Sequence, residues 1–297
     1  MHRYERLAQS SHPSCAQTLH CRLIKKALRY ADRLCTFEGA RLQSREARCR
    51  FWAGKLHRSY DGRALAECGN VPGSQRWVAE GTHLLPGREF IDCVKLRVNA
   101  MPNRTRTKRG QGGSKMCRAG CNQPESLGHI LQRCHRSDFK RIKRHDNIVE
   151  ELATRLRRRK WDVRVEPTVR TSEGKRFPDL VVSNKDTQVI LDVQVVGLNV
   201  SLGDAHRRKV AKYSVPEVLE QVRGSRETNP LVSSVTLSYR GVWASESAQV
   251  LADLGLGRED FKVLTVKCLQ GGLVCFRVHQ QMTTVAYPRV MARLAPQ

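Results

Sequence analysis

Two apolar segments that each carry one aspartate constrain the fold of this chain most strongly. Residues 177–182 hold Asp179, and residues 188–196 hold Asp192. A turn signal at residues 184–186 separates them, so the pattern predicts a β-hairpin in the core of a sheet. A carboxylate is costly to bury alone, but two carboxylates on neighbouring strands can share a divalent cation. The pair therefore predicts a metal site, with the alternative that each aspartate simply ends a strand.

A helix is expected to follow this hairpin. Asp204 is a candidate N-cap, and His206, Lys209 and Tyr213 are spaced three and four residues apart, which places them on one helix face. Lys212 lies off that face. Two metal-binding carboxylates and a lysine are typical of a nuclease, because metal activates water and neutralises phosphate while the lysine orients the water or stabilises developing charge.

The charge of the chain restricts its partners. Of 297 residues, 53 are Lys or Arg and 28 are Asp or Glu, a net charge of +25. Such an excess favours a polyanion, and nucleic acid first. A membrane is disfavoured because the sequence has neither a basic amphipathic segment with aromatic anchors nor an apolar run of about 18 residues. The N-terminus lacks an apolar signal core, so we expect the eleven cysteines to be reduced unless they bind metal.

The N-terminal third is rich in basic residues. Residues 1–96 are expected to form a mostly helical basic region, which is either a nucleic-acid face or a solvated helix surface. Residues 97–116 contain Gly, Asn, Pro and Thr among their basic residues and no acidic one, which indicates a flexible basic linker. Contact with a phosphate backbone is its natural use. The candidate contact residues there are Arg104, Arg106, Lys108 and Arg109.

A cluster of potential metal ligands follows the linker, within residues 117–137. Its members are Cys117, Cys121, His129 and Cys134. Three thiolates and one imidazole suit tetrahedral zinc, and a segment too short to bury a core would take its folding energy from the metal. His135 is a substitute ligand, and the alternative is four unrelated residues in a cysteine-rich chain.

Residues 138–297 read as an α/β domain. An amphipathic helix is expected over residues 138–160, with a core stripe of Phe139, Ile142, Val149, Leu152 and Leu156 and a basic rim that includes Arg141 and Arg144. A strand at 161–165, the hairpin, the helix and a strand at 234–243 complete the order of an α/β nuclease core. After a helix near 245–254, the segment around Gly271-Gly272 fits either two helices or a hairpin.

The order of four segments resembles one known family. They are CRAGCNQPESLGHILQRCH, RIKRHDNIVEELA, RFPDLVVSNKDTQVILDVQVV and AHRRKVAKY. In this order they resemble the carboxy-terminal part of the Pol protein of site-specific non-LTR retrotransposons, in the R-two clade that inserts into the large-subunit ribosomal RNA gene. The resemblance covers roughly residues 50–297. It implies a zinc knuckle followed by a restriction-like endonuclease of the PD-(D/E)xK type.

The resemblance also implies roles for individual residues. Asp179 and Asp192 match the carboxylates that bind magnesium, and Lys209 matches the catalytic lysine. The common nuclease pattern places this lysine two residues after the second acid, where this chain has Gln194, so Lys212 stays open as a substitute.

Two more residues beside these are candidates for function. Glu166 is either a further ligand of the metal or water, or a surface glutamate at the end of a strand. Arg176, which precedes the Pro-Asp pair, is a candidate phosphate contact.

The function that the resemblance implies is nicking of a ribosomal RNA gene. The freed 3′-hydroxyl would prime reverse transcription of the element RNA, which places the protein in the nucleus. The parent polyprotein is expected to be an RNA-directed DNA polymerase too, with a polymerase domain that is not in this chain. The alternative is a non-catalytic nucleic-acid-binding module from a decayed element.

Overall fold

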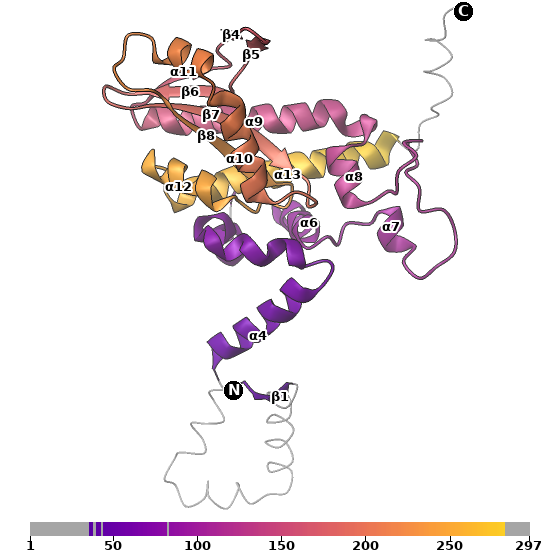
Figure 1. The fold of residues 1–297 in the computed structure, drawn as a ribbon. Coiled ribbons are helices and arrows are strands. Elements are labelled where there is room, and N and C mark those ends of the chain that lie inside the picture. Colours follow the sequence, from indigo (N-terminus) through magenta and orange to yellow (C-terminus); the bar gives the residue numbers. More distant parts are fainter. Residues whose placement is uncertain (1–35, 38–39, 43, 82, 283–297) are drawn as a thin grey trace, which may run out of the picture. The chain divides into compact units, whose positions relative to one another are not determined.

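The structure, a computed structural model, describes residues 36–37, 40–42, 44–81 and 83–282 (Figure 1). The chain divides into two units, up to Ser59 and from Tyr60 onward. In the first unit, β1 (Thr36–Phe37) pairs with β2 (Ala40–Arg41), and α4 spans Arg45–Arg58. The helices expected before residue 36 lie outside the described residues.

The centre of the second unit is a four-stranded sheet in the order β3-β6-β7-β8. Its strands are β3 (Asp162–Val165), β6 (Leu180–Ser183), β7 (Gln188–Val196) and β8 (Leu231–Ser238). β6 and β7 form the antiparallel hairpin that the sequence predicts, in the register Leu180 to Leu191. The Asn184 side chain closes its turn, because Oδ1 accepts hydrogen bonds from the N–H groups of Asp186 and Thr187. β3 is antiparallel to β6, and β8 is parallel to β7.

Alternate residues of β7 face two different layers of helices. Leu191 and Val193 pack in a core with α9 (Asp138–Arg158) and α13 (Arg258–Met282). Ile190 faces the other side and packs with α10 (Leu202–Tyr213) and α11 (Pro216–Arg223). A strand covered on both faces reads as a continuous apolar run, which explains the sequence signal. Asp192, an even-numbered residue of β7, therefore lies on the face that α10 covers.

Short elements surround this core. Between the two units' boundary and α9 lie η1 (Arg63–Asn70), η2 (Pro72–Gln75), α5 (Arg76–Ala79), α6 (Gly87–Arg97), α7 (Arg104–Thr107), α8 (Leu127–Gln132) and η3 (His135–Ser137). A ribbon of β4 (Val169–Thr171) and β5 (Gly174–Arg176) precedes β6, and α12 (Ser245–Asp253) precedes α13. No helix in the described part of the chain has the length and apolarity needed to cross a membrane.

The linker expected to be flexible over residues 97–116 is partly ordered. Arg97 ends α6 and is buried, and Asn103 caps α7 with a side chain only 2% exposed. The Asn103 Oδ1 atom accepts a hydrogen bond from the N–H of Arg106. Polar side chains in the linker therefore bond to its own backbone and fix a turn of helix that composition alone does not reveal.

The core stripe of α9 differs from the prediction in its first turns. Phe139 and Ile142 are 53% and 60% exposed. Ile148 and Leu152 are buried on one face of the helix. Arg144, four residues before Ile148, lies on the same face and is also buried. The helix therefore turns an arginine, rather than the two apolar residues, toward the interior at this end.

The segment with two consecutive glycines is one continuous helix, α13, so neither the two helices nor the hairpin expected there is found. A Cβ atom on Gly271 would lie 2.4 Å from Cγ of Arg144 in α9. A Cβ atom on Gly272 would lie 3.1 Å from Cδ1 of Leu96 in α6. The glycines are sites of close helix packing rather than breaks in the helix.

Candidate active site and metal centre

Asp179 and Asp192 lie opposite each other at one end of the hairpin. Asp179 precedes β6, and continuing the register of Leu180 and Leu191 by one residue pairs it with Asp192. Directly opposed residues of antiparallel strands project from the same face of the sheet. Both aspartates are buried, with 8% and 3% exposure. The hairpin thus brings the two aspartates side by side, with Asp192 under α10.

α10 brings a lysine to the same point. Nζ of Lys209 lies 2.5 Å from Oδ2 of Asp192. His206 faces β8, with Nδ1 2.9 Å from Oγ of Ser234, and Tyr213 donates its hydroxyl to the carbonyl of Phe177 at 3.0 Å. The three residues thus share the helix face that covers the sheet.

The start of α10 differs from the prediction. Ser201 is the N-cap, since its hydroxyl accepts from the N–H of Asp204, and Asp204 lies in the first turn. A serine hydroxyl and an aspartate carboxylate both satisfy free N–H groups, so composition alone did not place the boundary.

The carboxylates perturb a neighbouring tyrosine. Burial raises the pKa of Tyr213 far above its usual range, and the charges of Asp192 and Asp179 raise it further. The hydroxyl therefore remains a proton donor beside the acids. Nζ of Lys212 donates to this hydroxyl at 3.1 Å, so the structure places Lys209, not Lys212, against Asp192.

A histidine that the sequence analysis did not single out also reaches the site. Nε2 of His145, in α9, lies 3.2 Å from Oδ2 of Asp179 and 3.1 Å from the carbonyl of Val193. The same carboxylate oxygen accepts the Val193 N–H at 2.5 Å. The hydrogen bond to Asp179 raises the pKa of His145 to about 9. The available sequence signal was its position three residues before buried Ile148, which places it on the inner edge of α9.

Glu166 lies beside Asp179 in the sheet and contacts it through the backbone. Its N–H donates to the carbonyl of Asp179 at 2.9 Å, in line with the β3–β6 register. Its φ angle is +47°, in the left-handed region, and the residue is exposed. The contact seen at Glu166 is therefore a backbone one that supports Asp179.

Most of the arginines predicted to touch nucleic acid have partners within the protein. Guanidinium groups donate to backbone carbonyls in four cases: Arg104 to Met116, Arg106 to Asn99, Arg141 to Cys134 and Arg176 to Lys212. Arg109 lies 3.6 Å from Asp61, and Lys108 is half-buried. Arg144 differs most from the prediction, because it is 3% exposed beneath Gly271.

The four residues with zinc-ligand spacing converge. One ligand atom from each of Cys117, Cys121, His129 and Cys134 lies within 4.8 Å of the others. His129 is 5% exposed, and neither of its ring nitrogens has a hydrogen-bond partner among the described residues. Burying both nitrogens without a partner is costly unless one binds a metal. Three thiols and an imidazole at these separations suit tetrahedral zinc.

Two further histidines border this cluster. Nδ1 of His135 is 3.2 Å from Sγ of Cys121, and Nε2 of His279 in α13 is 3.4 Å from Sγ of Cys117. Cys117, Glu125 and His279 form a second group close enough to hold an ion.

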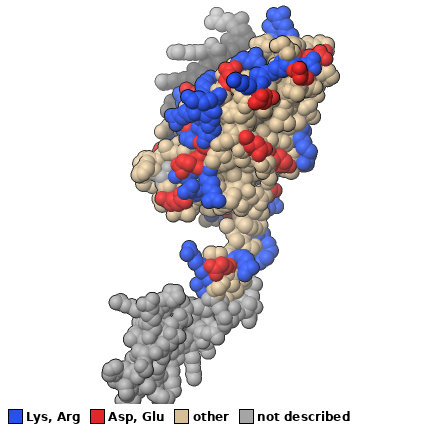
Figure 2. Space-filling model, turned by 90° about the vertical axis from the view of Figure 1, so that its left-hand side faces the viewer, with Lys and Arg blue, Asp and Glu red and all other residues tan. Residues whose placement is uncertain are grey.

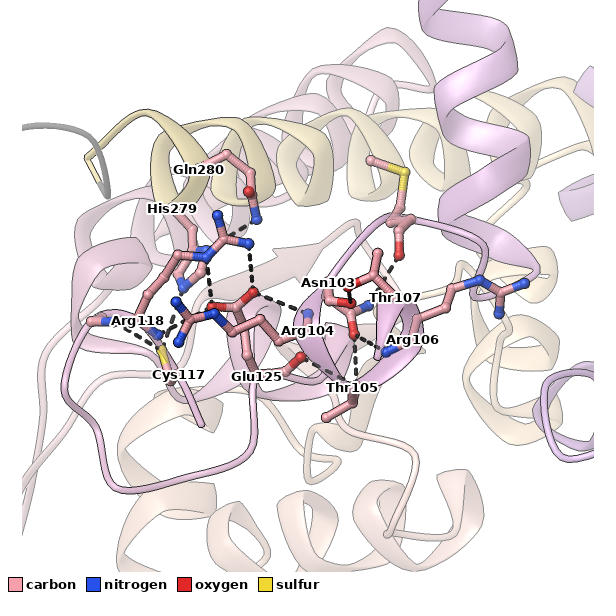
Figure 3. Close-up of polar contacts among 12 residues, drawn as sticks. Asn103, Arg104, Thr105, Arg106, Thr107, Cys117, Arg118, Glu125, His279 and Gln280 are labelled. Atoms are coloured by element: carbon pink, nitrogen blue, oxygen red, sulfur yellow. Dashed lines mark hydrogen bonds and ion pairs between the residues drawn. The ribbon is translucent and has the colours of Figure 1, made fainter. Parts of the chain in front are cut away.

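The carboxylate of Glu125 already has partners, which weakens that second group. Its oxygens accept the N–H groups of Arg104 and Arg118 and the Arg118 guanidinium (Figure 3). Burial raises the pKa of Glu125, but these donors outweigh burial and lower it overall. Glu125 thus ties the cysteine loop to α7, and the first group is the better zinc site.

Together these features define a mixed α/β protein with a buried carboxylate–lysine cluster and a Cys/His cluster that could hold zinc. No protein-family model matches the chain. Among curated proteins, it is 37% identical over 253 residues to the retrovirus-related Pol polyprotein of the type-2 retrotransposable element R2DM of Drosophila melanogaster. That match covers 84% of this chain and 24% of the relative.

Other relatives agree. The Pol polyproteins of type-1 R2 elements from Nasonia vitripennis and Popillia japonica are each 32% identical to the chain, over 78% and 80% of its length. The chain spans 23% of the first and 49% of the second. It belongs to the R2 retrotransposon Pol polyproteins and corresponds to one segment of them.

Proposed function

We propose that this segment is a magnesium-dependent DNA endonuclease of the PD-(D/E)xK type. The observation that carries the proposal is the convergence of Asp179, Asp192 and Lys209 from three successive elements, with an Nζ–Oδ2 distance of 2.5 Å. An acid pair and an amine at one buried point suit phosphodiester hydrolysis. Homology to retrotransposon Pol polyproteins supports the same class of activity.

The residues would divide the work as follows. Asp179 and Asp192 would hold Mg²⁺, since hard cations prefer carboxylate oxygens. The bound ion would act as a Lewis acid toward the phosphate and lower the pKa of a bound water. Lys209 would orient the attacking water or stabilise the charge that develops on the phosphate. Tyr213, kept protonated by burial and by the two acids, would donate a hydrogen bond at the edge of the site.

The wider role is proposed from the relatives. Nicking of a ribosomal RNA gene in the nucleus would free a 3′-hydroxyl that primes reverse transcription of the element RNA. Polymerase activity would belong to another segment of the parent polyprotein. Zinc held by Cys117, Cys121, His129 and Cys134 would fold the knuckle, which lies next to the basic linker in the chain.

A nicking assay with charge-matched variants tests the endonuclease. Zinc-loaded full chain is incubated with supercoiled plasmid carrying the ribosomal target, with and without Mg²⁺. Asp179→Asn and Asp192→Asn should abolish nicking, while Asp186→Asn should not, because Asp186 is exposed at the opposite end of the same hairpin. Nicking that persists in both site variants, or that needs no divalent cation, would refute the assignment.

The ion pair itself favours a second candidate. Lys209 and Asp192 would also serve as a structural salt bridge between α10 and β7 in a non-catalytic nucleic-acid-binding module. In that case Asp192→Asn would lower the unfolding midpoint while the wild-type chain binds DNA and never nicks it. The same plasmid assay, with a thermal melt beside it, separates the two functions.

A further inference from the structure

A groove of about 1160 Å³ lies beside the carboxylate–lysine cluster. Its walls come from the start of the second unit, the basic linker, the cysteine loop with α8, the segment after β7, and α10. The lining includes Tyr60, Arg63, Arg109, Lys115, Arg133 and Arg208. Its volume exceeds the range of about 300–1,000 Å³ that is usual for small-molecule sites.

The lining is positive and contains no acidic residue. Seven arginines and lysines line it, together with six asparagines and glutamines. By contrast, acidic side chains are interspersed among the basic ones on the face shown in Figure 2. An acid-free basic groove with amide side chains is suited to a phosphate backbone with base edges beside it.

Four of these cations have no carboxylate partner in the described part of the chain. No ion pair found among the described residues involves Arg63, Lys115, Arg133 or Arg208. This contrasts with the arginines that the sequence singled out, most of which donate to carbonyls of the protein. Pattern in the sequence could not distinguish the two sets, because the difference is set by tertiary neighbours.

An exposed aromatic ring lines the groove. Tyr60 is 68% exposed, and the guanidinium carbons of Arg63 and Arg109 lie 5.2 and 5.7 Å from its ring centroid. Exposed aromatic rings next to arginines are the surfaces on which unpaired bases stack.

The groove is also lined by residues that neighbour the candidate active site in sequence. Gln194, two residues after Asp192, lines the groove, and its Nε2 donates to the carbonyl of Ala205. Arg208 also lines it and precedes Lys209 in α10. A chain lying in the groove would therefore pass from the knuckle wall to residues that neighbour Asp192 and Lys209 in sequence.

We propose that this groove binds a single DNA strand that continues from the phosphodiester held at Asp179 and Asp192. The proposal rests on the endonuclease function for the identity of that phosphodiester. Phosphates of the strand contact Arg133 and Arg208, and one base stacks on Tyr60. A volume of this size accommodates a few nucleotides of one strand but not a turn of duplex.

Fluorescence anisotropy with labelled oligodeoxynucleotides tests the groove without requiring cleavage. Zinc-loaded full chain is titrated in Mg²⁺-free buffer into a single strand, its duplex and the RNA strand of equal length. The double variant Arg133→Ala/Arg208→Ala should weaken single-strand binding and reduce the slope of log affinity against log salt by about 1.4, or about 0.7 for each phosphate contact. Tyr60→Ala should weaken binding on the order of tenfold, and Tyr60→Phe should not.

Matched controls make the outcome decisive. Arg158→Ala/Arg164→Ala removes the same charge from two exposed arginines outside the groove and should leave the affinity near that of wild type. Equal weakening by both double variants would overturn the groove, as would tighter binding of duplex than of single strand. An RNA strand that binds tighter than DNA and depends on the same residues would overturn the DNA assignment.

Nicking assays run in parallel separate this proposal from the endonuclease. Wild-type nicking together with normal single-strand binding by the groove variants overturns the groove alone. Variant-sensitive binding in a chain that never nicks leaves the groove standing and removes the endonuclease. Zinc content and circular dichroism confirm that each variant is folded before affinities are compared.

Discussion

His145 and Asp179 contact each other around the end of the sheet, although α9 and α10 cover opposite faces of it. The Nε2–Oδ2 distance is 3.2 Å. Because the same oxygen also accepts the N–H of Val193, two donors fix the carboxylate. A carboxylate held in one rotamer presents its second oxygen in a constant direction, which is the usual role of hydrogen bonds that support metal ligands.

His145 is therefore predicted to act as a positioning residue for Mg²⁺. His145→Ala should raise the Mg²⁺ concentration needed for half-maximal nicking by roughly 10- to 100-fold. His145→Gln, whose amide N–H can replace the Nε2 donor, should recover part of this loss. Nicking rates measured across a Mg²⁺ titration check it. Identical Mg²⁺ dependence in wild type and His145→Ala would show that the contact is structural only.

The two candidate lysines should differ sharply in activity. Lys209 contacts Asp192, whereas the ammonium group of Lys212 contacts the hydroxyl and the ring of Tyr213. Lys209→Ala should lower the single-turnover nicking rate on the order of 10²–10³-fold, the cost of losing one charge-stabilising donor. Lys212→Ala should stay within a few fold of wild type. The reverse ranking would reassign the catalytic lysine to Lys212.

Zinc binding should depend on His129 and not on its neighbour in sequence. Only His129 joins the three cysteines in one group, while His135 approaches Cys121 from outside it. His129→Ala should lose the metal, and His135→Ala should retain one zinc per chain, as measured by atomic absorption after dialysis. If wild type binds two zinc ions per chain and Glu125→Gln binds one, the second ion lies at the group of Cys117, Glu125 and His279.

The sequence predicted the hairpin and the Cys/His cluster because local patterns encode them. Adjacent apolar runs fix the β6–β7 register, and that register brings Asp179 opposite Asp192. The four Cys/His residues that could hold zinc lie within one short segment. His145 could not be predicted, since its contact joins residues 34 positions apart and depends on how α9 packs.

The burial of individual arginines could not be predicted from the sequence for a similar reason. Arg144 and Arg133 look alike in sequence, yet one is buried against Gly271 and the other lines the groove. Side-chain burial is set by the packing of helices that are distant in sequence, so charge counts predict a polyanionic partner without locating where it binds.

Buried His206 should make stability depend on pH. Its ring lies between Ser234 and Ser247, and burial lowers its pKa below the ordinary value of 6.5. The unfolded chain then binds more protons in the window below pH 6.5, so the free energy of unfolding contributed by neutral His206 is lost as pH falls through it. Urea titrations between pH 5 and 8 should show a smaller pH slope for His206→Gln than for wild type. Equal slopes would mean that His206 titrates normally.

The two glycines of α13 should respond differently to the addition of one methyl group. In Gly271→Ala the new Cβ would lie 2.4 Å from Cγ and 2.7 Å from Cβ of Arg144, the rigid base of that side chain. Overpacking of this kind costs about 1–3 kcal/mol, against which alanine gains up to about 1 kcal/mol of helix propensity. In Gly272→Ala the new Cβ would lie 3.1 Å from Cδ1 of Leu96 and 3.8 Å from Cδ1 of Leu131, which are the tips of flexible side chains, so the change in unfolding free energy should be near zero or stabilising. Urea unfolding of both variants checks the order. If Gly271→Ala is the more stable of the two, α9 and α13 do not pack as closely as described, and the position of His145 beside Asp179 loses its support.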